Sequence, residues 1–253
     1  MDRQQQKICL YLGGAFPLIF FAGWGLIGGF LLPMPSPPQT PAQVAEFFTV
    51  NSTRIGIGMI IACLAAPLQG AMAAIVGVYL RRSGGHHSGL AYTQMLMGAI
   101  QVLFALVPCI MWATLAYRPG AHDPDTVQVL NDFAWLFFVG GFSPPLLQAL
   151  CAGLVILRDK RATPVLPRWV GYYNLWCALL FMPGGICLIA QHGPFAWNGI
   201  LAFWIPATVF GGWFFVMFFA LLKAIAADDG TAVAPGYPAG DTAGPQVASR
   251  AGA

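Results

Sequence analysis

Apolar residues form six long runs along the chain, separated by short polar segments. The runs cover residues 8–32, 55–80, 91–117, 133–157, 169–191 and 197–222, and none of them contains Asp, Glu, Lys, Arg or His. Each is long enough for a helix, which needs roughly 20 residues to cross about 30 Å of hydrocarbon. The pattern predicts an all-α polytopic membrane bundle of six transmembrane helices, formed by residues 1–227.

Composition and charge support a membrane protein and predict its orientation. The chain is 58% hydrophobic and 8% charged, far from the roughly 25% charged residues of soluble domains. Ten of the twelve Lys and Arg residues lie in the two terminal segments and in the second and fourth loops, whereas Arg54 and Arg118 lie on the other side. Because basic residues concentrate on the cytoplasmic side, we expect both termini to be cytoplasmic. The net charge of +3 reflects this bias and does not indicate nucleic-acid binding.

The segments outside the runs differ in composition. Residues 228–253 consist largely of Ala, Gly, Pro and Thr, which predicts a disordered cytoplasmic tail. In the loop 33–54, Thr40, Pro41 and Gln43 form the pattern of a capping box with proline at the first helical position. We therefore expect a short helix on the outer surface. Tyr117, Trp135 and Trp197 are expected at the outer membrane interface, where aromatic side chains are enriched.

Every run contains at least one proline: Pro17, Pro67, Pro108, Pro144 with Pro145, Pro183 and Pro206. The segment GGFSPPLLQA in the fourth run is the most unusual. A helical proline leaves the carbonyl four residues earlier without its hydrogen bond, which here frees Gly140 and Gly141. The pattern predicts a kinked fourth span, with the freed carbonyls bonded by Ser143, a neighbouring helix or water, and helices whose outer halves splay apart.

Four amide side chains lie at similar depth on four predicted helices: Gln69, Gln101, Gln148 and Asn174, between 14 and 17 residues from the outer ends of their runs. Amides at one level can bond neighbouring helices together. Alternatively they form the floor of an outward-facing cavity lined by Trp24, Phe104, Phe142 and Trp204, because transporters often bind substrates near the midplane beside broken helices. The candidate ligand-binding residues are Gln69, Gln101, Gln148, Asn174, Ser143 and Trp204.

Several kinds of chemistry lack the residues that they need. The runs carry no histidine for haem ligation and no carboxylate for a proton relay. The six cysteines all lie within runs and predict no disulfide framework. A metal site at His122, Asp123 and Asp125 is possible, but a helix cap at Asp123 followed by Pro124 explains these residues better. We expect no catalytic, cofactor or metal site.

These features leave three functional hypotheses. The first is binding or translocation of a small neutral or amphipathic solute through the cavity. The second is an accessory or structural subunit of a membrane assembly, with homo- or hetero-oligomers formed through the glycines of the first span, Gly25 and Gly29. The third is a membrane-embedded enzyme. The expected partners are membrane lipids and a small amphipathic ligand.

The C-terminal third of the apolar region carries a resemblance. The segments PRWVGYYNLW from Pro167, MPGG from Met182 and GPFAWNG from Gly193 are similar to those of an uncharacterised group of six-span membrane proteins from actinobacteria. The resemblance implies a bacterial plasma-membrane location. It implies no activity and no catalytic residues.

Overall fold

The computed structural model describes residues 2–84 and 88–227, and every regular element among them is a helix. In the labels below, η denotes a π- or 3₁₀-helical segment. The elements are α1 Arg3–Phe20, η1 Phe21–Ile27, α2 Pro41–Val50, α3 Ser52–Ala65, α4 Leu68–Gly84, α5 Gly89–Tyr117, α6 Pro124–Gly140, α7 Ser143–Arg158, α8 Arg168–Phe181, η2 Met182–Leu188, η3 Gly193–Phe195, η4 Ile200–Trp204 and α9 Ile205–Ala227. The predicted tail, 228–253, lies outside the described residues.

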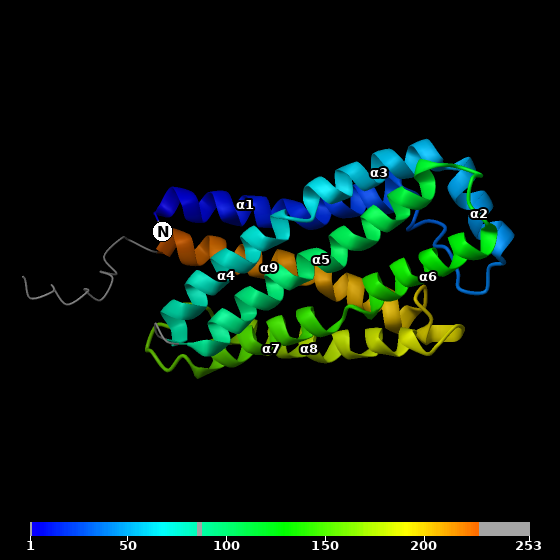
Figure 1. Cartoon of the computed structure of the whole chain (residues 1–253). Helices are drawn as coiled ribbons and strands as arrows, with labels where there is room; N and C mark the ends of the chain where they lie inside the picture. Colours follow the sequence, from blue (N-terminus) through cyan, green and yellow to red (C-terminus); the bar gives the residue numbers. More distant parts are fainter. Residues whose placement is uncertain (1, 85–87, 228–253) are drawn as a thin grey trace, which may run out of the picture.

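The helices form one elongated bundle, with α2 lying across one end (Figure 1). Six helical segments are long and apolar enough to cross a membrane: Arg3–Ile27, Ser52–Gly84, Gly89–Tyr117, Pro124–Arg158, Arg168–Leu188 and Gly193–Ala227. Large apolar side chains are exposed along their outer faces, among them Leu18, Ile60, Leu64, Leu96 and Trp176. Such side chains suit contact with lipid, so the prediction of a six-helix all-α membrane bundle is confirmed.

The fourth span is two helices instead of one kinked helix. α6 ends at Gly140 and α7 begins at Ser143, so Pro144 and Pro145 occupy the first turn of a new helix. The N–H groups of a first turn have no partner within the helix, and proline there therefore leaves no hydrogen bond unmade. The backbone N–H of Leu146 continues the helix by donating to the carbonyl of Phe142 at 3.1 Å.

Most of the other spans are also interrupted. α3 and α4 are separated at Pro67, and α8 continues as the 3₁₀ segment η2 from Met182. The first span widens into the π-helix η1 after Pro17 and leaves helical geometry after Ile27, five residues before the end of the apolar run. The sixth span contains the 3₁₀ turn η3 and the π-helix η4 before α9, which carries Pro206 at its second position. Among the described spans, only the third is a single α-helix, α5, which contains Pro108. α1 also contains its proline, Pro17, but gives way to the π-helix η1 at Phe21.

α2 confirms the predicted capping box and closes one end of the bundle, which we call the α2 end. The Thr40 hydroxyl accepts from the N–H of Gln43, and the Gln43 side chain accepts from the N–H of Thr40 at 2.9 Å. Val44 and Phe48 are buried beneath the helix. The loop before α2 is held by the Trp197 indole, whose Nε1 donates to the Pro35 carbonyl at 3.0 Å.

The glycine-rich part of the first span packs inside the chain. A Cβ at Gly58 of α3 would lie 2.6 Å from the Gly28 Cα, and one at Gly29 would lie 2.9 Å from the Arg54 guanidinium. Gly25 is similarly covered by the Leu31 side chain. These intramolecular contacts occupy the glycines for which we expected contacts with another chain, and oligomerisation through the first span stays a prediction.

Candidate functional site

A cavity of about 110 Å³ lies inside the bundle, at the level where the spans are interrupted. Its wall comes from α1, η1, α4, α5, α6, α7, α8, η2, η4 and α9, together with the break between α6 and α7. Every residue in the wall is uncharged, and nine are phenylalanines: Phe16, Phe20, Phe21, Phe104, Phe138, Phe142, Phe181, Phe203 and Phe210. The polar part of the wall consists of two side chains, Gln69 and Gln101.

Gln69 and Gln101 lie at the same level on two antiparallel helices. Ala73 of α4 faces Gly98 of α5, where an added Cβ would overlap the Ala73 side chain. Gln69 lies one helical turn before Ala73 on α4, and Gln101 lies one turn after Gly98 on α5. Because the helices run in opposite directions, both steps lead the same way along the bundle. The two side chains are 2% and 6% exposed. Nε2 and Oε1 of Gln69 and Oε1 of Gln101 have no hydrogen-bond partner among the described residues.

Buried amide atoms without partners are unusual, because leaving such a group unsatisfied costs about 1 to 3 kcal/mol. Those of Gln69 and Gln101 belong to residues that line a cavity. A polar guest in the cavity could supply the missing bonds, whereas a purely apolar guest could not. The two glutamines therefore give the cavity a hydrogen-bonding side within a wall of aromatic rings.

The helix breaks shape the aromatic part of the wall. Phe104 packs directly on Gly141, and any Cβ at Gly141 would overlap its ring. Phe142 packs on the next interruption, since a Cβ at Gly185 would lie 2.5 Å from the Phe142 ring. Glycine at each break thus allows a phenylalanine from a neighbouring segment to approach the backbone. The break in GGFSPP and the break at Met182 therefore meet at the cavity.

An aromatic plug, formed by Trp24, Phe30, Trp112, Trp135 and Phe138, fills the bundle between the cavity and the α2 end. The ring centroids of Trp24 and Phe138 are 5.0 Å apart, and those of Phe30 and Trp112 are 4.6 Å apart. Trp135 is fully buried in the plug, and Trp197, which stacks on it, is also buried, so neither side chain faces lipid as predicted. In this conformation the plug and α2 separate the cavity from that end of the molecule.

Asn174 has a different environment from the two glutamines. It is fully buried between α8 and α9, where its Oδ1 accepts from Trp213 Nε1 at 2.8 Å. Its Nδ2 donates to the carbonyl of Val170 at 2.8 Å and lies 3.5 Å from the sulfur of Met217. With its donors and its acceptor partnered, Asn174 joins two helices and does not line the cavity.

The other candidate residues lie around the cavity rather than in its wall. Gln148 of α7 is buried against α5, where its Nε2 lies 2.8 Å from the position of a Cβ at Gly98. Ser143 is exposed at the start of α7. Trp204 is half-buried and touches the wall residue Phe203 edge to face. Of the aromatic side chains expected around a cavity, Phe104 and Phe142 line it, whereas Trp24 belongs to the plug.

Most of the wall residues and several buried polar contacts carry no signal that predicted them from the sequence. Asn131 accepts from the plug residue Trp112, with Nε1 and Oδ1 3.2 Å apart. Gln94 is fully buried on α5, and neither of its amide atoms has a partner among the described residues. Gln94 lies seven residues before Gln101, so helical spacing could have identified it as a residue on the same face.

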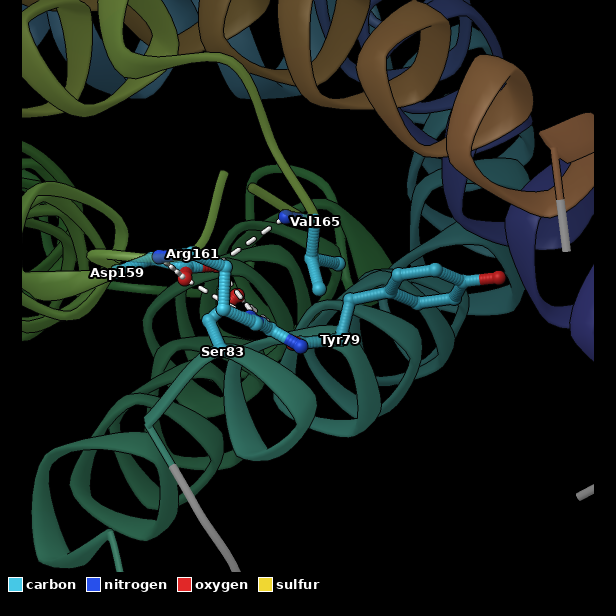
Figure 2. Close-up of polar contacts among 5 residues, drawn as sticks. All are labelled: Tyr79, Ser83, Asp159, Arg161 and Val165. Carbon is cyan, nitrogen blue, oxygen red and sulfur yellow. Dashed lines mark hydrogen bonds and ion pairs between the residues drawn. The ribbon is translucent and has the colours of Figure 1, made fainter. Parts of the chain in front are cut away.

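A second polar cluster lies outside the spans, where the chain passes from α7 to α8 (Figure 2). The buried carboxylate of Asp159 accepts from Arg161 Nε at 2.8 Å, from Arg161 Nη2 at 2.7 Å and from the backbone N–H groups of Arg161 and Val165. The hydrogen bonds from the Arg161 guanidinium are the main reason why the pKa of Asp159 falls to about 2. This cluster organises the loop between α7 and α8.

The alternative metal site is explained by helix capping. The Asp123 carboxylate accepts from the N–H of Thr126 at 3.3 Å and caps α6, with Pro124 at its first position. Within residues 2–84 and 88–227, no group of His, Cys, Asp and Glu side chains is arranged to hold a metal ion.

The geometry therefore identifies one candidate ligand site, the cavity with Gln69 and Gln101 in its wall. Comparison of the chain with family models, curated proteins and solved structures finds no match.

Proposed function

We propose that this multi-pass membrane protein binds a small uncharged molecule in the central cavity and carries it across the membrane. The observation that supports binding is the presence of unpartnered amide atoms, on Gln69 and Gln101, in the wall of an otherwise aromatic cavity. A charged guest is disfavoured because no wall residue could pair with its charge.

The interrupted helices support translocation. Transporter sites near the midplane commonly lie beside discontinuous helices, whose short segments can move relative to one another. In this protein the α6–α7 break, η1, η2 and η4 all contribute residues to the cavity wall. α1 and α9 lie side by side near the termini and diverge toward the α2 end (Figure 1). Release toward the α2 end would require the aromatic plug to move.

Filling the cavity tests the binding proposal. Ala207 of α9 lines the cavity, whereas its neighbour Thr208 is exposed on the outer face. We expect Ala207→Phe to abolish retention of small molecules that co-purify with the protein in nanodiscs, as measured by extraction and mass spectrometry. Thr208→Phe adds the same ring outside the cavity and should retain them. Equal retention by a folded Ala207→Phe protein and the wild type would contradict the proposal.

The proposed location is a bacterial plasma membrane, with both termini and the α7–α8 loop in the cytoplasm and α2 outside. The ten-to-two distribution of basic residues supports this orientation. A reporter enzyme that works only in the cytoplasm should be active when it is fused to the C-terminus. A tag inserted in the loop before α2 should be labelled in intact cells. Protection of the tag from labelling would indicate the opposite orientation.

A further inference from the structure

The hydrogen-bonding groups of the cavity determine which kind of ligand group could bind there. Gln69 presents an unpartnered Nε2, which donates, and an unpartnered Oε1, which accepts; Gln101 presents an unpartnered Oε1. Rotation of a carboxamide by 180° exchanges its oxygen and nitrogen, so the pair can offer donors and acceptors in more than one order. A ligand group that both donates and accepts is the chemical complement of this pair.

The rest of the wall excludes several ligand classes. No wall residue carries a charge, so a carboxylate or an ammonium group would be buried without a counter-ion. A hydrocarbon would fill the apolar part but leave the glutamine amides without partners. Sites built to hydrogen-bond a ligand discriminate strongly against analogues that lack the bonding group. The remaining class is neutral, with a donor and an acceptor close together.

The volume indicates the size of ligand that would fit. An engineered dry cavity of about 150 Å³ in another protein holds benzene, which has six carbon atoms. The cavity here measures about 110 Å³. It therefore suits a compact molecule of about four to six non-hydrogen atoms, by comparison with that case. Its apolar part would contact phenylalanine rings such as Phe104, Phe142 and Phe210.

We propose that the cavity selects small neutral carboxamides and lactams, with the amide group bonded to Gln69 and Gln101 and a compact apolar body against the phenylalanines. This inference rests on the proposed binding function, and it adds the chemical class of the ligand.

Three probes of nearly equal shape test it: isobutyramide, 3-methylbutan-2-one and isobutyrate. The ketone replaces the amide nitrogen by a methyl group and so keeps the acceptor without the donor, whereas isobutyrate keeps the shape but is charged. Binding to the protein in nanodiscs is measured by saturation-transfer NMR, and the Ala207→Phe protein supplies the background from partition into lipid. We expect isobutyramide to bind at least about tenfold more tightly than either analogue.

The glutamines themselves are tested by Gln69→Met and Gln101→Met, singly and together, because methionine is unbranched and similar in length. Each change should reduce the preference for isobutyramide over the ketone, and the double change should abolish it. Gln128→Met, at the α2 end, serves as the matched control and should retain the preference.

The outcomes separate this inference from the binding proposal. Equal binding of the amide and the ketone to the wild type, above the Ala207→Phe background, would overturn the ligand class and leave cavity binding intact. Full preference for the amide in the double methionine variant would also overturn the ligand class. Binding of all three probes at the background level would contradict the binding proposal, and with it this inference.

Discussion

Asn174 and the pair Gln69–Gln101 are the same kind of side chain at a similar depth in the bundle, yet their environments are opposite. Asn174 bonds Trp213 and Val170 and joins α8 to α9. Gln69 and Gln101 line a cavity with amide atoms that have no partner among the described residues. These residues therefore differ in what can complete their hydrogen bonds: neighbouring groups of the protein at Asn174, and a molecule in the cavity at Gln69 and Gln101.

The largest effect is expected where the amide is fully bonded. Asn174→Leu should lower the free energy of unfolding by about 1 to 3 kcal/mol, because it leaves the buried Trp213 Nε1 without an acceptor. Thermal or denaturant unfolding in detergent measures the change. Adding Trp213→Phe removes the orphaned donor and should recover much of the loss. An unchanged stability of the single variant would show that Asn174 is not a structural link.

The cavity amides should show the reverse behaviour. The double change Gln69→Met with Gln101→Met should weaken ligand retention about tenfold, equivalent to about 1.4 kcal/mol of binding free energy. Stability should not fall, because the lost groups have no protein partner to leave behind. Ligand retention is measured by mass spectrometry of co-purified molecules, and stability is measured by thermal or denaturant unfolding. A stability loss as large as that of Asn174→Leu would erase the difference between the two regions.

Asp159 extends the comparison to a polar group with charged partners outside the spans. Its folded-state pKa of about 2 lies below that of an unfolded Asp, about 3.9. The Asp159–Arg161 contact therefore stabilises the fold fully above about pH 4 and loses this effect as the pH falls toward 2. Asp159→Asn should lower stability by about 1 kcal/mol at neutral pH, since the Arg161 side chain is 47% exposed.

The matching measurement for Asp159 is an unfolding series between pH 6 and pH 2. The difference between the wild type and Asp159→Asn should shrink as the pH falls. A constant difference across this range would mean that the carboxylate charge is not the stabilising element.

The smallest effect is expected at Gln148, which is buried against Gly98 but is absent from the cavity wall. Gln148→Leu should change stability by less than about 1 kcal/mol, in line with measured values for polar contacts between membrane helices. Ligand retention should stay at the wild-type level. Loss of ligand retention in a folded Gln148→Leu protein would show that Gln148 also belongs to the ligand site.

Elements whose signals are local could be predicted from the sequence. Long apolar runs without charged residues identify the six spans because a helix that crosses lipid must be predominantly apolar over about 20 residues. Thr40 with Gln43, and Asp123 with Pro124, identify two helix starts because each cap involves residues only three apart. Four of the spans change or break their helical geometry close to a proline, whereas α5 continues through Pro108 and α1 through Pro17. The prolines did not indicate whether each disturbance would be a kink, a π-helix or a complete break.

The environment of each polar or aromatic side chain depended on the tertiary structure. Depth along a helix placed Gln69, Gln101, Gln148 and Asn174 in one layer, but depth does not specify the direction in which a side chain points or what it meets. Trp135 looked like an interface residue from its position near the end of a run, and packing placed it inside the aromatic plug.

The sequence alone determined that this protein is a bundle of six apolar helices with disturbed helical geometry near mid-depth, because these properties follow from the length and composition of continuous segments. The tertiary structure decided that the breaks meet around one cavity, that Gln69 and Gln101 line it and that Asn174 does not. Those facts depend on contacts between residues far apart in the chain, such as Gly98 with Ala73 and Gly141 with Phe104, and no local pattern encodes which helix faces which.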